Sequence, residues 1–123
     1  MSEMPEIAAE VSGTPTSAWD IAEVPAVEVV LTVAMHLMSA AAVACGLAED
    51  EDGHPAPPAD LAEARILITA LAGLVTASAP LIGSMHAAPL RDGLQSLQRA
   101  FREASPFPDE RGKGPGEELT GAV

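Results

Sequence analysis

The three histidines are the residues best suited to bind a metal or transfer a proton, and their spacing supports neither role. His36 lies within a long apolar segment, His54 in a proline-rich stretch and His86 near the start of a later segment. No two of them have the i, i+3 or i+4 spacing that places two metal ligands on one helix face. We interpret His36 as a partly buried polar residue, with a ligand or general base as the alternative. His54 is expected in a solvated loop, and His86 could cap or orient a helix.

Cys45 and the serines lack the surroundings of a nucleophile. A catalytic thiolate is stabilised at a helix N-terminus or beside cations. Cys45 instead lies near the end of an apolar segment, with Glu49, Asp50 and Glu51 after it. Since neighbouring acids raise the pKa of a thiol, Cys45 is predicted to have a packing role. No serine stands in a G-x-S-x-G context.

Two further stretches resemble ligand loops only in composition. The acidic run 49–52 lacks the alternating aspartates and the closing glutamate of a calcium loop, and prolines follow it. The segment GKGPGEE (112–118) has neither the preceding strand nor the following helix of a phosphate-binding loop. We therefore predict no catalytic residue, no metal site and no cofactor, and we predict that the protein is not an enzyme.

Apolar segments and the residues at their ends predict helices. The first segment, 24–47, is rich in Ala, Leu and Met, which favour helix, and Gly46 stands where a helix C-terminus favours glycine. The second segment, 60–79, begins at Asp60, which together with Glu63 resembles a capping box. The sequence thus predicts an apolar helical hairpin.

Prolines separate these segments from each other and from a third helix. Residues 49–59 hold three prolines and are predicted to form a loop. Pro80 is expected to end the second helix at the residue before it. The third helix, 87–104, is predicted to be amphipathic. Its apolar stripe consists of Leu90, Leu94, Leu97 and Phe101, and its residues predicted to face water are Arg91, Asp92, Gln95, Gln98 and Arg102.

The chain divides into three parts on this basis. Residues 20–104 are predicted to form an all-α domain of three helices, and no period-two stretch indicates a strand. Residues 1–19 are expected to be a disordered acidic arm. Residues 105–123, with Gly or Pro at nearly every second or third position, are expected to be a disordered tail.

The net charge of the chain and its distribution exclude some classes of binding partner. The 123-residue chain has a net charge of −12, and residues 1–64 hold twelve acids and no Lys or Arg. Nucleic-acid phosphates would be repelled, so no direct nucleic-acid binding is expected. An acidic arm beside a neutral helical body could steer a basic protein partner instead. The acidic start, MSEMPEIAAE, does not resemble a secretory signal, so a cytoplasmic location is expected.

The two apolar segments raise the question of a membrane. Residues 29–48 and 66–85 hold no charged side chain, and each is long enough to cross a bilayer. Each segment also carries a polar stripe, which suits a helix with one face toward solvent or a partner. The stripes consist of Glu28, Thr32, His36 and Ser39, and of Arg65, Thr69, Gly73 and Thr76. No Lys or Arg precedes Arg65, so a soluble hairpin is predicted, with a membrane-associated hairpin as the alternative.

A soluble domain of this composition has more apolar surface than it can bury alone. Small domains bury only about 60% of their chain surface. Small residues that permit close helix contact are Ala40, Ala41, Ala44, Ala70, Gly73 and Ala77. We therefore predict a homo-oligomer assembled through the hairpin. Met35, Met38 and Met85 could form a pliable binding surface, but we interpret them as core residues.

Several strings resemble a small bacterial family, the one numbered 1844 among domains of unknown function, in its form from high-GC Gram-positive bacteria. The resemblance covers nearly the whole chain from Asp20. It is carried by DIAEVPAVEVV (20–30), HLMSAAAVACGLAED (36–50), DLAEARILITALAGLVTASAP (60–80), GSMHAAPLRDGLQSLQ (83–98), FREASPFPDE (101–110) and GPGEELTG (114–121). In the tail, the family more often has Lys near Glu118 and Pro near Ala122.

The resemblance implies a short helical domain with no assigned activity, so it carries over no site residue. It also implies that related genes often lie beside the gene for translation initiation factor three. We therefore expect a non-enzymatic cytoplasmic interaction or oligomerisation module linked to translation. The alternative is a membrane-associated helical hairpin protein.

Overall fold

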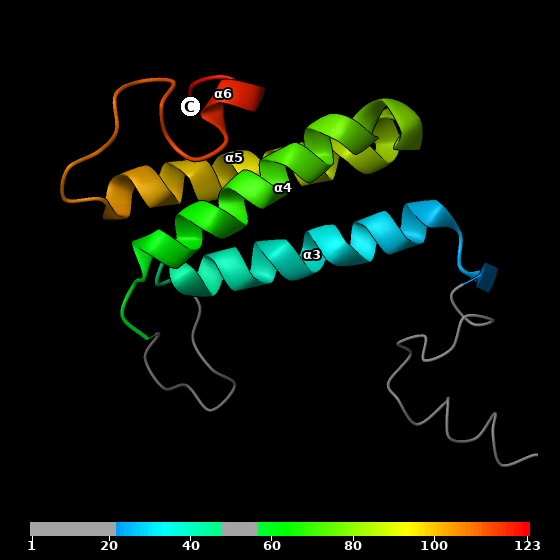
Figure 1. Cartoon of the computed structure of the whole chain (residues 1–123), viewed down its shortest axis with the longest axis horizontal. Coiled ribbons are helices and arrows are strands. Elements are labelled where there is room, and N and C mark those ends of the chain that lie inside the picture. The colour runs from blue at the N-terminus through cyan, green and yellow to red at the C-terminus, as the bar shows by residue number, and fades with distance from the viewer. Residues whose placement is uncertain (1–21, 48–56) are drawn as a thin grey trace, which may run out of the picture.

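The computed structural model describes residues 22–47 and 57–123, in which all regular secondary structure is helical. Its elements are α3 (Ala26–Ala44), α4 (Leu61–Ile82), α5 (Ser84–Ala104) and the short α6 (Glu117–Thr120). α4 packs against both α3 and α5 (Figure 1). The predicted all-α fold with three main helices is therefore confirmed, whereas the acidic arm predicted over 1–19 lies outside the described residues.

α3 ends at Ala44, and Gly46 stands just after the C-cap residue Cys45, at the helix C-terminus where the sequence predicts a glycine. Gly46 has a φ of 80°, which favours glycine, and its amide donates to the Val43 carbonyl at 2.9 Å. The Leu47 amide donates to the Ala42 carbonyl at 3.0 Å. These two hydrogen bonds form a Schellman motif, which satisfies carbonyls that the end of the helix would otherwise leave without a partner.

Asp60 joins the end of α3 to the beginning of α4. Its carboxylate accepts a hydrogen bond from the Glu63 amide at 3.2 Å, which is the N-cap that the sequence predicts. The Asp60 amide donates to the Ala44 carbonyl at 2.7 Å. The hairpin of α3 and α4 is therefore tied at its closed end by backbone as well as by side chain.

α4 and α5 extend beyond their predicted limits. α4 continues through Pro80 to Ile82, although a proline within a helix removes one hydrogen-bond donor and crowds the preceding turn. The Gly83 amide donates to the Ala79 carbonyl at 3.2 Å, which closes the last turn. α5 begins immediately afterwards, at Ser84. The prediction of a longer connection was wrong: Gly83 alone, with a φ of 87°, joins the two helices.

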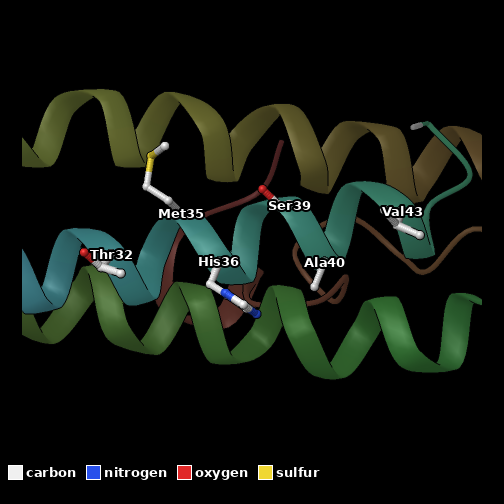
Figure 2. Close-up of a pocket in the computed structure, with 6 residues that line it drawn as sticks. All are labelled: Thr32, Met35, His36, Ser39, Ala40 and Val43. Carbon is white, nitrogen blue, oxygen red and sulfur yellow. The ribbon is translucent and has the colours of Figure 1, made fainter. Parts of the chain in front are cut away.

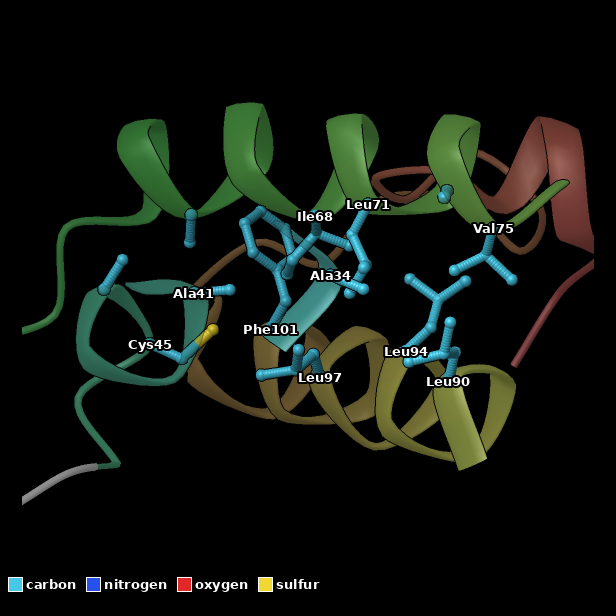
Figure 3. Packing of buried hydrophobic residues seen from close by; sticks show 13 residues of the cluster. Ala34, Ala41, Cys45, Ile68, Leu71, Val75, Leu90, Leu94, Leu97 and Phe101 are labelled. Atoms are coloured by element: carbon cyan, nitrogen blue, oxygen red, sulfur yellow. The ribbon is translucent and has the colours of Figure 1, made fainter. Parts of the chain in front are cut away.

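The hydrophobic core lies where the three long helices meet (Figure 3). The predicted apolar stripe of α5 is buried there, opposite large residues of α4 and small residues of α3. The buried cluster consists of Ala34, Ala41, Ala44, Cys45, Ala64, Ile68, Leu71, Ala72, Val75, Leu90, Leu94, Leu97 and Phe101. The fully buried residues of α3 are therefore alanines, and its larger side chains Leu31, Leu37 and Met38 are half-buried against the edge of the cluster.

Residues 105–123, predicted to be a disordered tail, are instead folded against α4 and α5, and we name them the C-terminal strap. In Figure 1 the strap and α6 lie over α4 and α5 on the side away from α3. Arg65 Nη2 on α4 contacts the two carboxylate oxygens of Asp109 at 2.9 and 3.2 Å. The Arg65 guanidinium also lies 5.0 Å from the centre of the Phe101 ring, at cation–π distance.

Gln98 holds the middle of the strap. Its side-chain amide donates to the Pro115 carbonyl at 3.0 Å and to the Thr120 hydroxyl at 3.2 Å. The sequence predicted that Gln98 faces water, and this prediction was wrong because the strap covers it. These two bonds satisfy the buried side-chain NH2 group, whereas the Oε1 atom of the same amide is buried without a partner in the described residues.

Glu117 is the one acidic residue buried in the described part of the chain. It is 3% exposed, and its carboxylate accepts a hydrogen bond from the Gly112 amide at 2.9 Å. The Arg102 guanidinium lies 3.6 Å from the same carboxylate. The charge of Glu117 is therefore compensated from both the strap and α5.

Candidate interaction surface

Of the three histidines, the structure describes His36 and His86, which lie on different helices. His36 is exposed on α3 rather than partly buried, and His86 is exposed near the beginning of α5. His54 lies outside the described residues. Within residues 22–47 and 57–123, no group of three His, Cys, Asp or Glu side chains could hold a metal ion.

Cys45 packs in the core at the end of α3, which confirms its predicted packing role. Burial raises the pKa of the thiol above its ordinary value of 9.0, because the thiolate would lose its hydration. The acids that the sequence suggested as a cause, Glu49 to Glu51, lie outside the described residues. The environment of Cys45 is therefore that of a structural thiol.

We expect Cys45 to react with a thiol reagent much more slowly in the folded chain than in the chain unfolded by urea. A raised pKa means that the folded state holds the thiol proton more tightly. This contribution to stability is complete below the ordinary pKa of 9.0 and is lost as the pH rises through the raised value. When the pH is raised through this range, the free energy of unfolding measured by urea titration should therefore fall less for Cys45→Ala than for the natural chain. Equal labelling rates in the folded and unfolded chains would contradict the burial.

The outer face of α3 is a shallow apolar hollow with a few polar groups. We define it by the residues that line the hollow: Thr32, Met35, His36, Ser39, Ala40 and Val43. The hollow has a volume of about 490 Å³ (Figure 2). Figure 2 shows Met35 and Ser39 along one edge of the face, and His36 and Ala40 along the edge beside α4.

The methionines are placed differently from their prediction as core residues. Met35 on α3 is 59% exposed and Met85 on α5 is 85% exposed, so the core assignment was wrong for both. Met38 does pack inward, and its Cε atom would lie 2.8 Å from a Cβ placed on Gly93. Glycine at this position therefore lets α3 and α5 approach each other around Met38.

α3 is apolar along its length, yet only Ala34, Ala41 and Ala44 are fully buried. By length and composition alone, both α3 and α4 could cross a membrane, but only 11% of the apolar window of α3 is buried, against 33% for α4. Val29 and Val33 are also exposed beside the outer face. Packing on the core accounts for the inner side of α3, where Leu31, Leu37 and Met38 are half-buried, but not for the apolar residues on its exposed side.

The outer face also carries the polar stripe that the sequence predicts. Glu28, Thr32, His36 and Ser39 are all exposed, which confirms that this side of α3 faces away from the core. The Thr32 hydroxyl donates to the Glu28 carbonyl at 2.8 Å, within the helix. The His36 ring and the Ser39 hydroxyl can each donate and accept a hydrogen bond. The face thus combines apolar contact area with groups that can fix the position of a partner.

A second, smaller hollow lies between α4, α5 and the strap. Its volume is about 230 Å³, and its floor includes the buried side chains of Val75 and Leu94. Leu119 and Thr120 of the strap line one side, and Arg91 is the one cation among the lining residues. The strap therefore helps to shape this hollow, and the sequence pattern gives no sign of it because glycine and proline are frequent in residues 105–123.

Comparison with known proteins finds a family but no described relative. The model of the family with the description "Domain of unknown function (DUF1844)" matches residues 26–103. This range begins at the first residue of α3 and ends one residue before the end of α5, so it covers the three long helices and excludes the strap. No curated protein and no solved structure matches the chain.

Proposed function

The chain belongs to this DUF1844 family, and because the description of the family names no activity, we propose a function from the surface of the molecule. The protein is a non-enzymatic cytoplasmic interaction or oligomerisation module that binds its partner through the outer face of α3. The observation that carries this proposal is the 19-residue helix α3, whose apolar window is only 11% buried. Contiguous exposed apolar patches on soluble proteins mark sites of protein contact.

The chemistry of the outer face supports binding rather than catalysis. The face offers Met35 and Val43 for apolar contact and Ala40 for close approach of a second backbone. Its polar groups, His36 and Ser39, lie on an open surface with no cleft that would exclude water from a reacting bond. Contact through such a face would gain free energy mainly from burial of apolar area, so it should tolerate high salt.

Two identical substitutions test whether the outer face is the binding surface. We expect Met35→Glu to reduce the capture of host proteins by the tagged full-length chain at least tenfold, because the new charge must be buried without a counter-charge. Met85→Glu, at an exposed position of α5, is the matched control and should leave capture unchanged. Circular dichroism checks that both variants fold. Equal capture by the two variants would contradict the proposal.

A link to translation is the finer part of the proposal and rests on the gene neighbourhood that the family resemblance implies. The same capture experiment, made from the native host at two salt concentrations, tests it. Ribosomal or initiation components held by the natural chain and lost with Met35→Glu would support the link. Their absence at both salt concentrations would remove it.

Membrane association is the second candidate, because α3 and α4 are both long and apolar enough to span a bilayer. It is less well supported, since the polar stripe lies along the exposed side of α3 and the chain carries a net charge of −12, which anionic lipid headgroups repel. Membrane fractionation with a carbonate wash distinguishes the two candidates. Retention in the washed pellet would favour the membrane hairpin.

A further inference from the structure

We propose that the outer face of α3 is occupied by the same face of a second copy of this chain, packed antiparallel about a two-fold axis. This inference rests on the proposed function and names the partner of the same surface. The first argument is charge. From Val29 to Leu47 the chain carries no charged side chain, although its net charge is −12. A second outer face is equally uncharged, so pairing two of them buries no charge without a counter-charge.

The second argument is that the face is chemically complementary to itself. The Ser39 hydroxyl and the His36 imidazole each donate and accept, so each can pair with the same groups of a second copy. Ala40 and Ser39 are small enough for two helices to pack at the usual interaxial distance of roughly 8–10 Å. Met35, at one edge of the face, is flexible enough to fill the remaining space.

A lipid surface fits the same face less well. A helix lying on a membrane needs an apolar side free of polar groups and a cationic opposite side. On α3 the hydroxyls and the imidazole lie among the apolar residues of the hollow, and no basic residue lies in its last turn. The polar groups would therefore lose hydrogen bonds in lipid that a second outer face can replace.

The orientation follows from the one charged residue of α3. Glu28 is exposed in the first turn. In a parallel pair, the two Glu28 carboxylates would lie side by side and repel each other. In an antiparallel pair they lie at opposite ends of the contact, and residues near its middle meet the same region of the partner. The hollow runs from Thr32 to Val43, so its middle falls between His36 and Ser39, and both lie within one helical turn of the two-fold axis.

Cross-linking from a single introduced thiol tests this arrangement in the full-length chain. We expect Ser39→Cys to give a covalent dimer with a short bis-maleimide at micromolar protein concentration. Ser96→Cys, an identical substitution at an exposed position of α5, should give at least tenfold less. The natural chain controls for Cys45, which is buried. Sedimentation equilibrium should give twice the mass of one chain, and Met35→Glu in the Ser39→Cys chain should abolish both the dimer mass and the cross-link.

Three outcomes would overturn the inference. The first is cross-linking at Ser39→Cys no greater than at Ser96→Cys. The second is the mass of a single chain for the natural protein at micromolar concentration. The third is flotation of the natural chain with phosphatidylcholine vesicles, lost in Met35→Glu, without a covalent dimer. If one of these outcomes is found but Met35→Glu still abolishes capture of host proteins, the self-pairing is contradicted and the proposed function is supported. If Met35→Glu changes neither the capture of host proteins nor the formation of the dimer, both the self-pairing and the proposed function are contradicted.

Discussion

Replacing Ile68 with alanine is expected to lower the free energy of unfolding by about 2–5 kcal/mol. Ile68 is fully buried on α4, within the cluster that joins the three long helices (Figure 3). The substitution removes apolar atoms from the core and leaves a cavity, because the surrounding helices are close-packed and relax only in part. Urea unfolding followed by circular dichroism measures the loss.

Ile66 provides a matched control on the same helix. Its side chain is 63% exposed, against 0% for Ile68, so Ile66→Ala removes the same atoms from a largely solvated position. We expect a change of less than about 0.5 kcal/mol for Ile66→Ala, since substitutions of exposed residues have small effects. Similar losses for both variants would mean that α4 does not present Ile68 to the core as described.

Replacing Gly116 with alanine is expected to detach the C-terminal strap from α4. Gly116 has a φ of 76°, and a Cβ at this position would lie 2.6 Å from the Cβ of Ala72. The left-handed conformation costs an alanine roughly 1 kcal/mol, and the overlap adds about 1–3 kcal/mol because Ala72 is held on a packed helix. Trypsin should then cleave after Arg111 and Lys113 much faster than in the natural chain, as followed by mass spectrometry.

The variant Gly112→Ala is a control that separates the conformational cost from the steric overlap. It has a similar φ of 83°, but a Cβ at this position would meet nothing within 4 Å. Gly112→Ala therefore carries only the conformational cost, roughly 1 kcal/mol, and trypsin cleavage should increase far less than with Gly116→Ala. If the two variants are cleaved at the same rate, close packing of the strap on Ala72 does not hold it in place.

The helices were predictable because their signals are local. Asp60 and Glu63 lie three residues apart and cap α4, and Gly46 ends α3 with the conformation that favours glycine. The apolar stripe of α5 repeats at helical spacing, and its four residues are buried as predicted. Each of these features depends on neighbours within about one turn of helix, so the sequence pattern alone indicates them.

The strap was not predictable because its anchors are far apart in the sequence. Arg65 and Asp109 are 44 residues apart, and Gln98 and Pro115 are 17 apart. Frequent glycine and proline is typical of disordered tails, but the same residues form tight turns where partners hold them. The buried Glu117 has no local signal, since an acid in a glycine-rich segment is ordinarily solvated.

The outer face of α3 was predictable only in part. The polar stripe of Thr32, His36 and Ser39 indicated which side faces outward, and the structure confirms that side. The core assignment of Met35 failed because α3 turns Ala34, Ala41 and its neighbour Met38 toward the core, which leaves Met35 59% exposed on the other side. Helical spacing cannot distinguish these two sides when both are apolar, and packing against α4 decides between them.

The single-residue connection at Gly83 also bears on the order in which contacts form during folding. α4 and α5 are separated by one residue, so bringing them together closes the shortest possible loop and costs little chain entropy. The contact between Arg65 and Asp109 closes a loop of 44 residues and gains free energy only after the helices beneath it are in place. Local contacts of this kind form fastest, so the pair α4–α5 is the natural nucleus, to which α3 and finally the strap attach.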